Sequence, residues 1–383
     1  MLDATRTAPT DDLLRIGMFW PTSRIQMPTE YLARQNPDVV DLDFQRRVAR
    51  EVEAAGFDFV LVADGYTGVS DEGRRIGHLD PTTNAILWAL PIFAATTTLG
   101  VVTTMHPTFL EPAQLAAYGA ALDRASNGRW AWNITTGFRD EEARLFGLDG
   151  MPEHEARYET AEDCVEIAIR LWSGERVTWK GRHRSVDGRL LGPTPVQKPY
   201  PTLVNAGASA RGRRFAGRLC TYVFASNPRF SYAAEMAEEL TALAEEFGRP
   251  EPARLLMLCT SLLREDPAEA RRELVKIKLA QQGEATLKKF VVAMSAGSES
   301  TAANAAANAE ATQTSLLTET DLVGSPEDVA EKIIVAYRDH GLRGLMCSLP
   351  VWWPEEIRRY SRMFDVLRKA GVWLPAAERP VLW

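Results

Sequence analysis

Short apolar segments alternate with amphipathic helical patterns along almost the whole chain, and this alternation restricts the fold more than any other feature. Segment 57–63, FDFVLVA, is apolar on both faces, as strands buried in a parallel sheet are. Strands separated by helices form right-handed βαβ units, and eight such units favour a closed barrel. The sequence therefore predicts an α/β fold, a (β/α)8 TIM barrel with insertions. The expected strands are 14–20, 57–63, 99–104, 129–134, 200–206, 221–225, 255–263 and 344–348.

Helical patterns fill the intervals between these strands. The helix expected at 81–95 has Asp80 as its N-cap and Pro81 in its first turn, where the missing proline N–H costs nothing. Residues 176–186 predict a small β-hairpin around Lys180-Gly181. The other helices are expected at 43–55, 112–125, 155–172, 209–218, a segment ending at 246, 329–340 and 354–369.

We interpret residues 1–383 as one domain of this type. Residues 1–12 are polar and are expected to form a flexible tail. Residues 283–320 are rich in Ala, Ser, Thr, Asn and Gly, a composition that buries little apolar surface. Two interpretations of this segment stay open: a lid that orders over the barrel mouth when a ligand binds, and a passive surface insertion.

The charge balance and the distribution of special residues exclude several classes of function. A net charge of −7 and a pI near 5.5 argue against a nucleic-acid partner. The N-terminus has no leader-like pattern and no apolar run reaches about 18 residues, so we expect a cytoplasmic protein without membrane contact. The five histidines lack HxH or HExxH spacing, so no metal site is expected. Scattered cysteines without a CxxC pair predict buried, reduced thiols at Cys164, Cys220, Cys259 and Cys347.

Segment 123–137, DRASNGRWAWNITTG, joins a helix end, a turn, a strand and a polar strand exit. Asn127-Gly128 is a strong turn signal because both residues tolerate left-handed backbone angles. Asn133 and Gly137 are among the small polar residues at the end of the following strand. Because active sites of parallel barrels lie where strands end, this segment predicts part of a site.

An anion site is the first candidate outside that segment. Strand TLVNAG ends at Gly207, and Ala208 and Ser209 then open a helix whose free amides and dipole attract negative charge. The same Gly-Ala-Ser sequence also serves as an ordinary helix cap, so both interpretations remain open. Late positions in a barrel favour a phosphate site.

Two further candidates lie at the start of a helix and at the end of a strand. His154 and Tyr158 lie four residues apart at a helix start, so both can face one ligand, although a capping histidine is the simpler interpretation. Thr103 and Thr104, with His106, end the strand at 99–104, where β-propensity alone also explains threonine. No GxSxG elbow, Walker loop or GxGxxG fingerprint is present.

Taken in order, these motifs resemble those of the bacterial luciferase-like flavin monooxygenases. The resemblance covers residues 14 to about 369, and its specific parts are DRASNGRWAWNITTG, HEARYE, NAGAS and GSPEDVAEKI. The pattern is most similar to the two-component, FMN-dependent branch with pyrimidine-ring-opening, dimethylsulfone and alkanesulfonate monooxygenases. It implies that a separate flavin reductase supplies reduced FMN, which acts with O2 on a small organic substrate. A C–N, C–S or C–halogen bond would be oxygenated or cleaved, and a homodimer or homotetramer is expected.

The resemblance also implies roles for individual residues. Thr104 and Asn133 match the residues that hold oxygen against the flavin, and they are the expected catalytic pair. Phe138 stands where the pyrimidine enzyme has a tryptophan, which makes uracil a doubtful substrate. The expected cofactor contacts are Ala63, Asp64, Thr104, Asn133, Gly137, His154, Tyr158, Ala208 and Ser209. An oxygenating flavin needs a dry pocket, and the expected walls are Trp20, Phe138, Trp352 and Trp353.

Two alternatives share the same fold. A deazaflavin-dependent oxidoreductase would transfer hydride and need no oxygen. A non-catalytic flavin-binding paralogue would hold FMN and turn over nothing.

Overall fold

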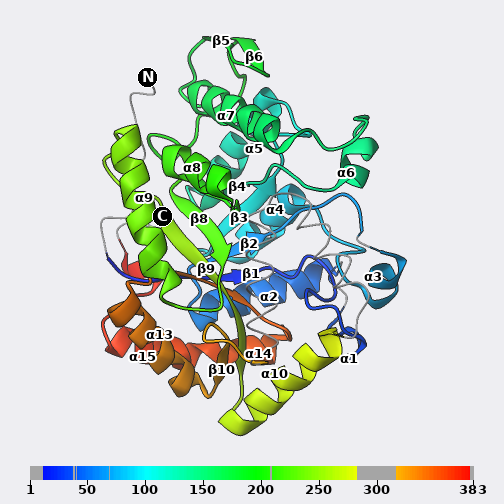
Figure 1. Cartoon of the computed structure of the whole chain (residues 1–383), viewed down its shortest axis with the longest axis vertical. Helices are drawn as coiled ribbons and strands as arrows, with labels where there is room; N and C mark the ends of the chain where they lie inside the picture. Colours follow the sequence, from blue (N-terminus) through cyan, green and yellow to red (C-terminus); the bar gives the residue numbers. More distant parts are fainter. Residues whose placement is uncertain are drawn as a thin grey trace.

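Eight parallel strands close into a barrel in the computed structural model, which describes residues 12–37, 39, 41–68, 70–207, 209–282 and 316–379. Neighbouring strands pair in chain order from β1 to β9, and the β8–β9, β9–β11 and β11–β1 pairings complete the ring (Figure 1). The predicted TIM barrel is thus confirmed. The barrel strands are β1 (Arg15–Phe19), β2 (Phe59–Val62), β3 (Gly100–Met105), β4 (Trp130–Ile134), β7 (Thr202–Asn205), β8 (Tyr222–Ser226), β9 (Arg254–Leu263) and β11 (Gly344–Ser348).

Strand β9 is ten residues long, and it pairs with a short strand outside the barrel as well as with two barrel strands. Its first half pairs with β8 and its middle with β11. Its last residues, Ser261 to Leu263, pair with the short strand β10 (Leu322–Gly324). The chain therefore returns to the barrel wall directly before helix α13 (Pro326–His340), which Ser325 caps through a capping box.

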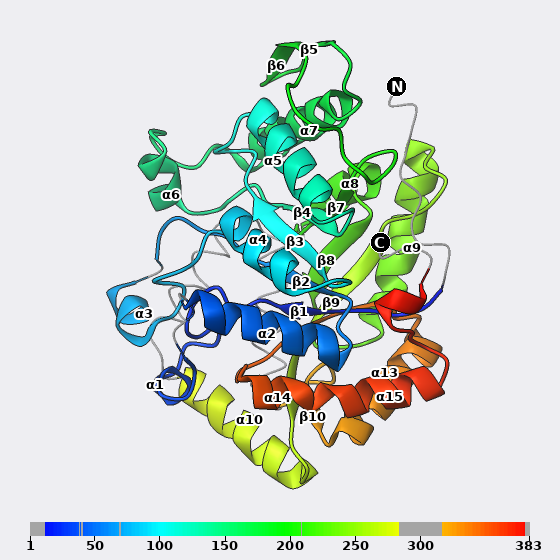
Figure 2. The ribbon, with the colours of Figure 1, turned by 180° about the vertical axis from the view of Figure 1, so that it is seen from behind.

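Helices surround the barrel in both views of the ribbon (Figures 1 and 2). They are α2 (Leu42–Ala55), α4 (Ala85–Ala95), α5 (Pro112–Ala125), α7 (His154–Leu171), α8 (Ala210–Leu219), α9 (Tyr232–Phe247), α13, α14 (Pro354–Arg358) and α15 (Tyr360–Lys369). Further elements are α1 (Glu30–Ala33), α3 (Asp71–Ile76), α6 (Asp140–Leu145), the 3-10 turn Ala376–Glu378 and the hairpin β5 (Val177–Lys180) with β6 (Ser185–Gly188). None of the described helices is long and apolar enough to cross a membrane.

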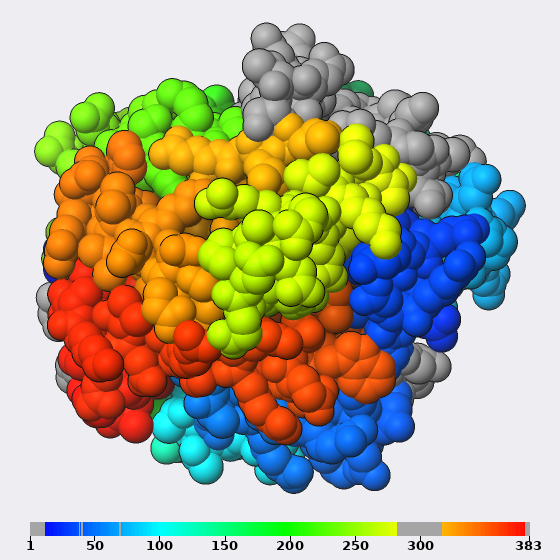
Figure 3. Space-filling model, turned by 90° about the horizontal axis from the view of Figure 1, so that it is seen from below, coloured from blue at the N-terminus to red at the C-terminus, as the bar shows by residue number. Residues whose placement is uncertain are grey.

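Helix α10 (Pro267–Gln282) was not predicted. It lies on the surface beside the blue N-terminal segment that carries α1 (Figure 3). The Lys276 ammonium stands 4.1 Å from the centre of the Tyr31 ring, a cation–π contact between the two elements. The buried residues of α10, Ala270, Leu274 and Ile277, recur at helical spacing, so the sequence contained the apolar periodicity that could have predicted this helix.

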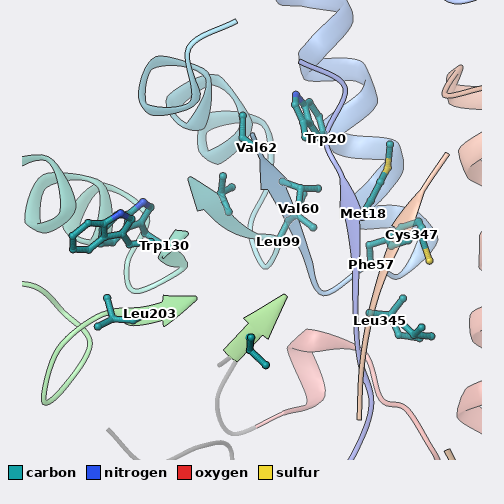
Figure 4. Close-up of a cluster of buried hydrophobic side chains, with 14 of the residues drawn as sticks. Met18, Trp20, Phe57, Val60, Val62, Leu99, Trp130, Leu203, Leu345 and Cys347 are labelled. Atoms are coloured by element: carbon teal, nitrogen blue, oxygen red, sulfur yellow. The ribbon is translucent and has the colours of Figure 1, made fainter. Parts of the chain in front are cut away.

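The core has two layers because successive side chains of a strand point to opposite faces. Outward side chains such as Met18 and Val60 pack under the helices (Figure 4). Inward side chains fill the barrel with a smaller cluster of Phe59, Leu61, Val102, Ala131, Val204, Tyr222, Leu256 and Met346. The four cysteines are free and buried, as predicted.

Other expectations need correction or lie outside the described residues. The helix predicted at 81–95 begins at Ala85, and its cap is Asn84, whose side chain accepts a hydrogen bond from the Leu87 amide. Thr82 and Thr83 instead donate to the Thr22 carbonyl, which holds the preceding segment outside the helix. The predicted helix at 354–369 is two helices, α14 and α15. Residues 1–11 of the expected tail and 283–315 of the expected lid are outside the described part.

Candidate functional site

A cavity of about 360 Å³ opens where the barrel strands end. Residues at the exits of β2, β3, β4, β7 and β8 line it, together with the start of α7 and the N-cap of α8. Its position agrees with the general location of active sites in TIM barrels. The predicted residues that line it are Ala63, Asp64, Thr104, Asn133, Gly137, Phe138, His154, Tyr158 and Ser209, whereas Ala208 lies outside the described residues.

Asn133 and Thr104 face each other across two neighbouring strands. The register of β3 and β4 places them side by side, and Asn133 Nδ2 donates to Thr104 Oγ1 at 2.9 Å. Both side chains are almost completely buried, and the Asn133 Oδ1 atom has no hydrogen-bond partner within the described structure. A buried carbonyl oxygen without a partner is costly, so a ligand in the cavity is its natural complement.

Gly207, Ser209 and Gly212, near the end of β7 and the start of α8, form a narrow cradle at the cavity wall. A Cβ atom on Gly207 would collide with the Tyr158 hydroxyl, and one on Gly212 would come within 2.6 Å of the Gly207 carbonyl. Ser209 caps α8 by accepting from the Gly212 amide at 2.9 Å, and its hydroxyl lies 3.4 Å from His154 Nε2. Small residues therefore let the start of a helix approach a bound anion closely.

Two arginines near this cradle differ in what they can offer an anion. Arg211 is ion-paired with Glu155 at 2.7 Å and Glu162 at 3.1 Å, and it does not line the cavity. Arg157 does line it, is almost fully buried, and donates to the Gly137 carbonyl. Arg157 was missed as a site residue, although its place between His154 and Tyr158 in the HEARYE motif could have indicated it.

Asp64 stands at the exit of β2, where its carboxylate is held by two donors. Asn84 Nδ2 donates to Asp64 Oδ2 at 2.9 Å, and the Gly65 amide donates to Oδ1 at 3.0 Å. Burial raises the pKa of Asp64 to about 7, and the Glu142 carboxylate adds to this, while the Gly65 and Ala85 amides oppose it. The side chain is therefore divided between its neutral and charged forms at neutral pH.

Helix α6, which was not predicted, adds a buried ion pair to the same wall. Arg139 pairs with Glu142, and the Glu142 carboxylate also accepts from the Tyr66 amide at 2.9 Å. Both residues of the pair line the cavity. The segment DEEARL is short and strongly charged, so its sequence gives no periodic apolar signal.

His106 also lines the cavity, next to Thr135. The Thr135 hydroxyl and His106 Nδ1 are 2.9 Å apart. Burial lowers the pKa of His106 to about 4, with the Glu142 carboxylate acting in the opposite direction. The imidazole is neutral at neutral pH, and it brings a polar but uncharged group to the cavity.

The three tryptophans predicted to line the pocket do not do so in the described cavity. Trp20 is completely buried in the outer core, because the preceding Phe19 points into the barrel and strand side chains alternate. Figure 4 shows Trp20 on the outer side of β1, towards α2. Trp352 packs against Phe44, and Trp353 donates its Nε1 proton to the Gln35 carbonyl at 2.6 Å. Phe138 alone of these predicted walls lines the cavity.

Comparisons with known proteins agree with this architecture. A dibenzothiophene-sulfone monooxygenase of Rhodococcus erythropolis is 28% identical over 270 residues, which cover 62% of this chain and 58% of that protein. This chain thus spans somewhat over half the length of the first curated relatives that it matches. An FMNH2-dependent dimethylsulfone monooxygenase of Pseudomonas putida is 26% identical over 333 residues, covering 84% of this chain and 86% of that protein.

Solved structures share the fold at low sequence identity. The EDTA monooxygenase of Chelativorans sp. BNC1 superposes with a TM-score of 0.82 at 19% identity, covering 97% of both chains. A riboflavin lyase superposes with a TM-score of 0.82 at 23% identity, covering 97% of this chain and 94% of that one. The sequence pattern of the luciferase-like monooxygenases matches residues 14–344, which is most of the chain. The chain therefore belongs to the luciferase-like monooxygenase family.

Proposed function

We propose that this chain is the oxygenating component of a two-component monooxygenase that uses reduced FMN and O2. The observation that carries the proposal is one cavity lined both by the buried Asn133–Thr104 pair and by the Gly207–Ser209 cradle. Its volume of about 360 Å³ falls within the range of small-molecule sites. The FMN-dependent relative of Pseudomonas putida, similar along most of both chains, supports the choice of cofactor.

The residues present fit FMN. The cradle offers the phosphate a helix N-terminus, the Ser209 hydroxyl and a close approach that a Cβ atom on Gly207 would block. Arg157 supplies a buried positive charge in the same cavity. Apolar side chains suited to the face of a ring system complete the wall: Phe19, Leu61, Ala63, Phe224 and Leu258.

Reduced FMN, when bound, would supply the two electrons with which O2 is activated. The chain's own residues would orient oxygen and exclude water. Asn133 can present its unpaired Oδ1 to an N–H donor of the ring system, while the Thr104 hydroxyl, which accepts from Asn133 Nδ2, keeps its own proton to donate toward oxygen. Amide and hydroxyl groups donate and accept hydrogen bonds without becoming nucleophiles, and they act best in a dry, preorganised site.

We propose that the substrate is a small organic molecule, which is oxygenated or cleaved at a C–N, C–S or C–halogen bond. Two relatives carry names that refer to sulfones, and others to nitrilotriacetate and EDTA, so both C–S and C–N chemistry occur among similar proteins. We further propose that the enzyme is cytoplasmic and that a separate NAD(P)H:flavin reductase is its partner. We also propose that it forms a homodimer or a homotetramer.

Cofactor binding and oxygen consumption test the proposal. The purified chain is titrated with FMN and with a deazaflavin cofactor, and binding is followed by flavin fluorescence. FMN is expected to bind more tightly, and the chain with a flavin reductase, NADH and FMN should oxygenate members of a panel of sulfones, sulfonates and amines. Preferential binding of the deazaflavin would instead support hydride transfer, and FMN binding without turnover of any panel member would support a non-catalytic paralogue.

A further inference from the structure

Asp64 borders a second cavity as well as the central one. This second cavity has a volume of about 410 Å³ and lies between the segment that follows β2 and the segment that precedes α4. Within the described structure, Asp64 is the one residue that lines both cavities. Most side chains that line the second cavity are polar, among them Thr67, Asp80, Thr82, Thr83 and Asn84.

The carboxyl group of Asp64 is fixed in this position by Asn84. The Asn84 side chain uses its oxygen to cap α4 by accepting from the Leu87 amide, so its nitrogen must point the other way. That nitrogen donates to Asp64 Oδ2 at 2.9 Å, while the Gly65 amide holds Oδ1. The carboxyl group thus has no freedom to leave the wall between the two cavities without breaking both hydrogen bonds.

The groups around Asp64 leave it without an ion-pair partner among the described residues. The Glu142 carboxylate on α6 acts on Asp64 as a negative charge, and Arg139 forms an ion pair with that carboxylate. The ring of His106 faces the Asp64 backbone and is neutral at neutral pH. The Tyr66 ring contacts the His106 ring and also interacts with Asp64. Asp80, across the second cavity, lies 3.8 Å from the Arg74 guanidinium. A buried carboxyl without a cation can hold a proton at physiological pH, because here the effect of burial outweighs the backbone amides that favour the charged form.

We propose that Asp64 is a proton-carrying catalytic residue that connects the two cavities, receiving protons from water in the second cavity and delivering them to ligands in the central cavity. The inference rests on the proposed function, because it assigns the central cavity to FMN, oxygen and substrate. In the step itself, the O–H bond of Asp64 breaks and a new O–H bond forms on a negatively charged oxygen atom of the ligand. The Asp64 carboxylate then regains a proton from water, and no electrons are exchanged.

Asp64→Asn keeps the size of the side chain and an oxygen for Asn84, but it cannot carry a proton. Asp187→Asn is the matched control, because Asp187 lies on the exposed hairpin strand β6 and lines neither cavity. The first measurement follows aspartate carboxyl carbons by ¹³C NMR during a pH titration of the ligand-free proteins. The signal missing in Asp64→Asn belongs to Asp64, and we expect its midpoint near neutral pH.

The second measurement follows the reoxidation of bound reduced FMN by oxygen in a stopped-flow spectrometer at pH values on both sides of neutrality. Wild type and Asp187→Asn should slow as the pH rises through the Asp64 midpoint. Asp64→Asn should be about 10²-fold slower at low pH and show no inflection, the loss expected when a general acid is removed. Equal FMN affinity of the three proteins would show that the substitution leaves the fold and the cradle intact.

The possible failures are distinguishable. If FMN does not bind to wild type, the proposed function fails, and the role of Asp64 fails with it. If FMN binds but Asp64 titrates in the ordinary range of aspartate, about 4, only the proton-carrying role is overturned. The same holds if the pH dependence of reoxidation is unchanged in Asp64→Asn.

Discussion

The amide nitrogen of Asn133 on β4 donates a hydrogen bond of 2.9 Å to the hydroxyl oxygen of Thr104 on β3. This contact fixes which end of the amide faces the cavity, because the oxygen remains without a partner in the described structure. Both side chains are buried, so neither reorients at low cost. The pair thus presents a preorganised acceptor beside a hydroxyl where the barrel strands end.

Removing either member of this pair should slow the reaction of bound reduced FMN with oxygen. Asn133→Ala is expected to cost about 10²-fold, the usual effect of losing a preorganised polar contact in a dry site. Thr104→Val should cost less, and the double variant should be no slower than Asn133→Ala, because the residues act as a unit. Stopped-flow absorbance of the flavin measures the rates.

Thr103→Val is the control for that series. Thr103 lies one position earlier on β3, and its hydroxyl accepts from Trp130 Nε1 at 2.8 Å in the outer core. Its loss should reduce the free energy of unfolding by about 1 kcal/mol and leave the flavin reaction unchanged. An Asn133→Ala protein as fast as wild type would remove the proposed oxygen contact.

The cradle between β7 and α8 should tolerate no added methyl group at Gly207. A Cβ atom there meets the Tyr158 hydroxyl and lies 2.7 Å from Asn205 Oδ1, so Gly207→Ala must displace the segment that faces the phosphate. We expect FMN affinity to fall by a factor of about ten or more, equivalent to about 1.4 kcal/mol. Gly188→Ala, in the hairpin with no atom within 4 Å, should bind FMN as wild type does. Fluorescence titration measures both, and equal affinities would contradict the cradle.

Acid should destabilise the protein partly through His106. Burial lowers its folded-state pKa to about 4, against about 6.5 in an unfolded chain, so the unfolded state binds more protons between these values. The contribution of the neutral His106 imidazole to the stability of the folded state is complete above pH 6.5. It decreases as the pH falls and is lost below about 4. His106→Asn should remove a pH-dependent term on the order of 3 kcal/mol from this window.

Urea denaturation of wild type and His106→Asn at several pH values measures that term. Burial also lowers the pKa of His78 to about 4. This residue therefore adds a similar dependence of stability on pH, which His106→Asn retains. The partly exposed His340 provides the control variant His340→Asn, which should follow wild type. Parallel pH dependence in wild type and His106→Asn would refute a buried neutral imidazole.

Helix α4 offers a surface for self-association. None of its 11 residues is charged, and Leu87 and Leu90 are 65% and 48% exposed, although a helix this apolar is usually covered. Tyr118 on the neighbouring α5 extends the exposed apolar surface. An uncharged surface suits a second copy of the same chain, because a symmetric contact brings like groups together.

The double substitution Leu87→Glu with Leu90→Glu should convert an oligomer to monomers, because four negative charges would meet across each symmetric contact. Leu191→Glu, at a 95% exposed leucine on the loop after β6, should leave the assembly unchanged. Sedimentation velocity measures the masses. A monomeric wild type, or an unaltered mass of the double variant, would contradict this interface.

The barrel could be predicted because each of its strands is a short apolar run between helical patterns, as at 57–63. The polar exits of β3 and β4 could be predicted for the same reason, since parallel strands bring their ends to one rim. The direction in which an aromatic side chain points, into the barrel or away from it, could not be predicted. Phe19 and Trp20 are adjacent and equally apolar, and only the alternation set by the pairing of β1 with β2 turns Phe19 inward.

The remaining errors have local causes. Asp80 and Asn84 are both good N-caps, and hydrogen bonds from Thr82 and Thr83 to another loop select the later one. Helix α6 is too short and too charged to give a periodic signal, so its Arg139–Glu142 pair was invisible in the sequence. These contacts depend on tertiary structure, which local propensity does not contain.

The two hydrogen bonds of Asn84 tie the thermal stability of a helix to the chemistry of a carboxyl group. Aspartate and asparagine are equally good helix N-caps, but an aspartate at position 84 would place a second carboxylate next to that of Asp64. Serine would cap α4 but has no amide nitrogen to donate. A stabilised variant of this protein must therefore be sought away from the start of α4, because a different cap there would alter the proton equilibrium of Asp64 beside it.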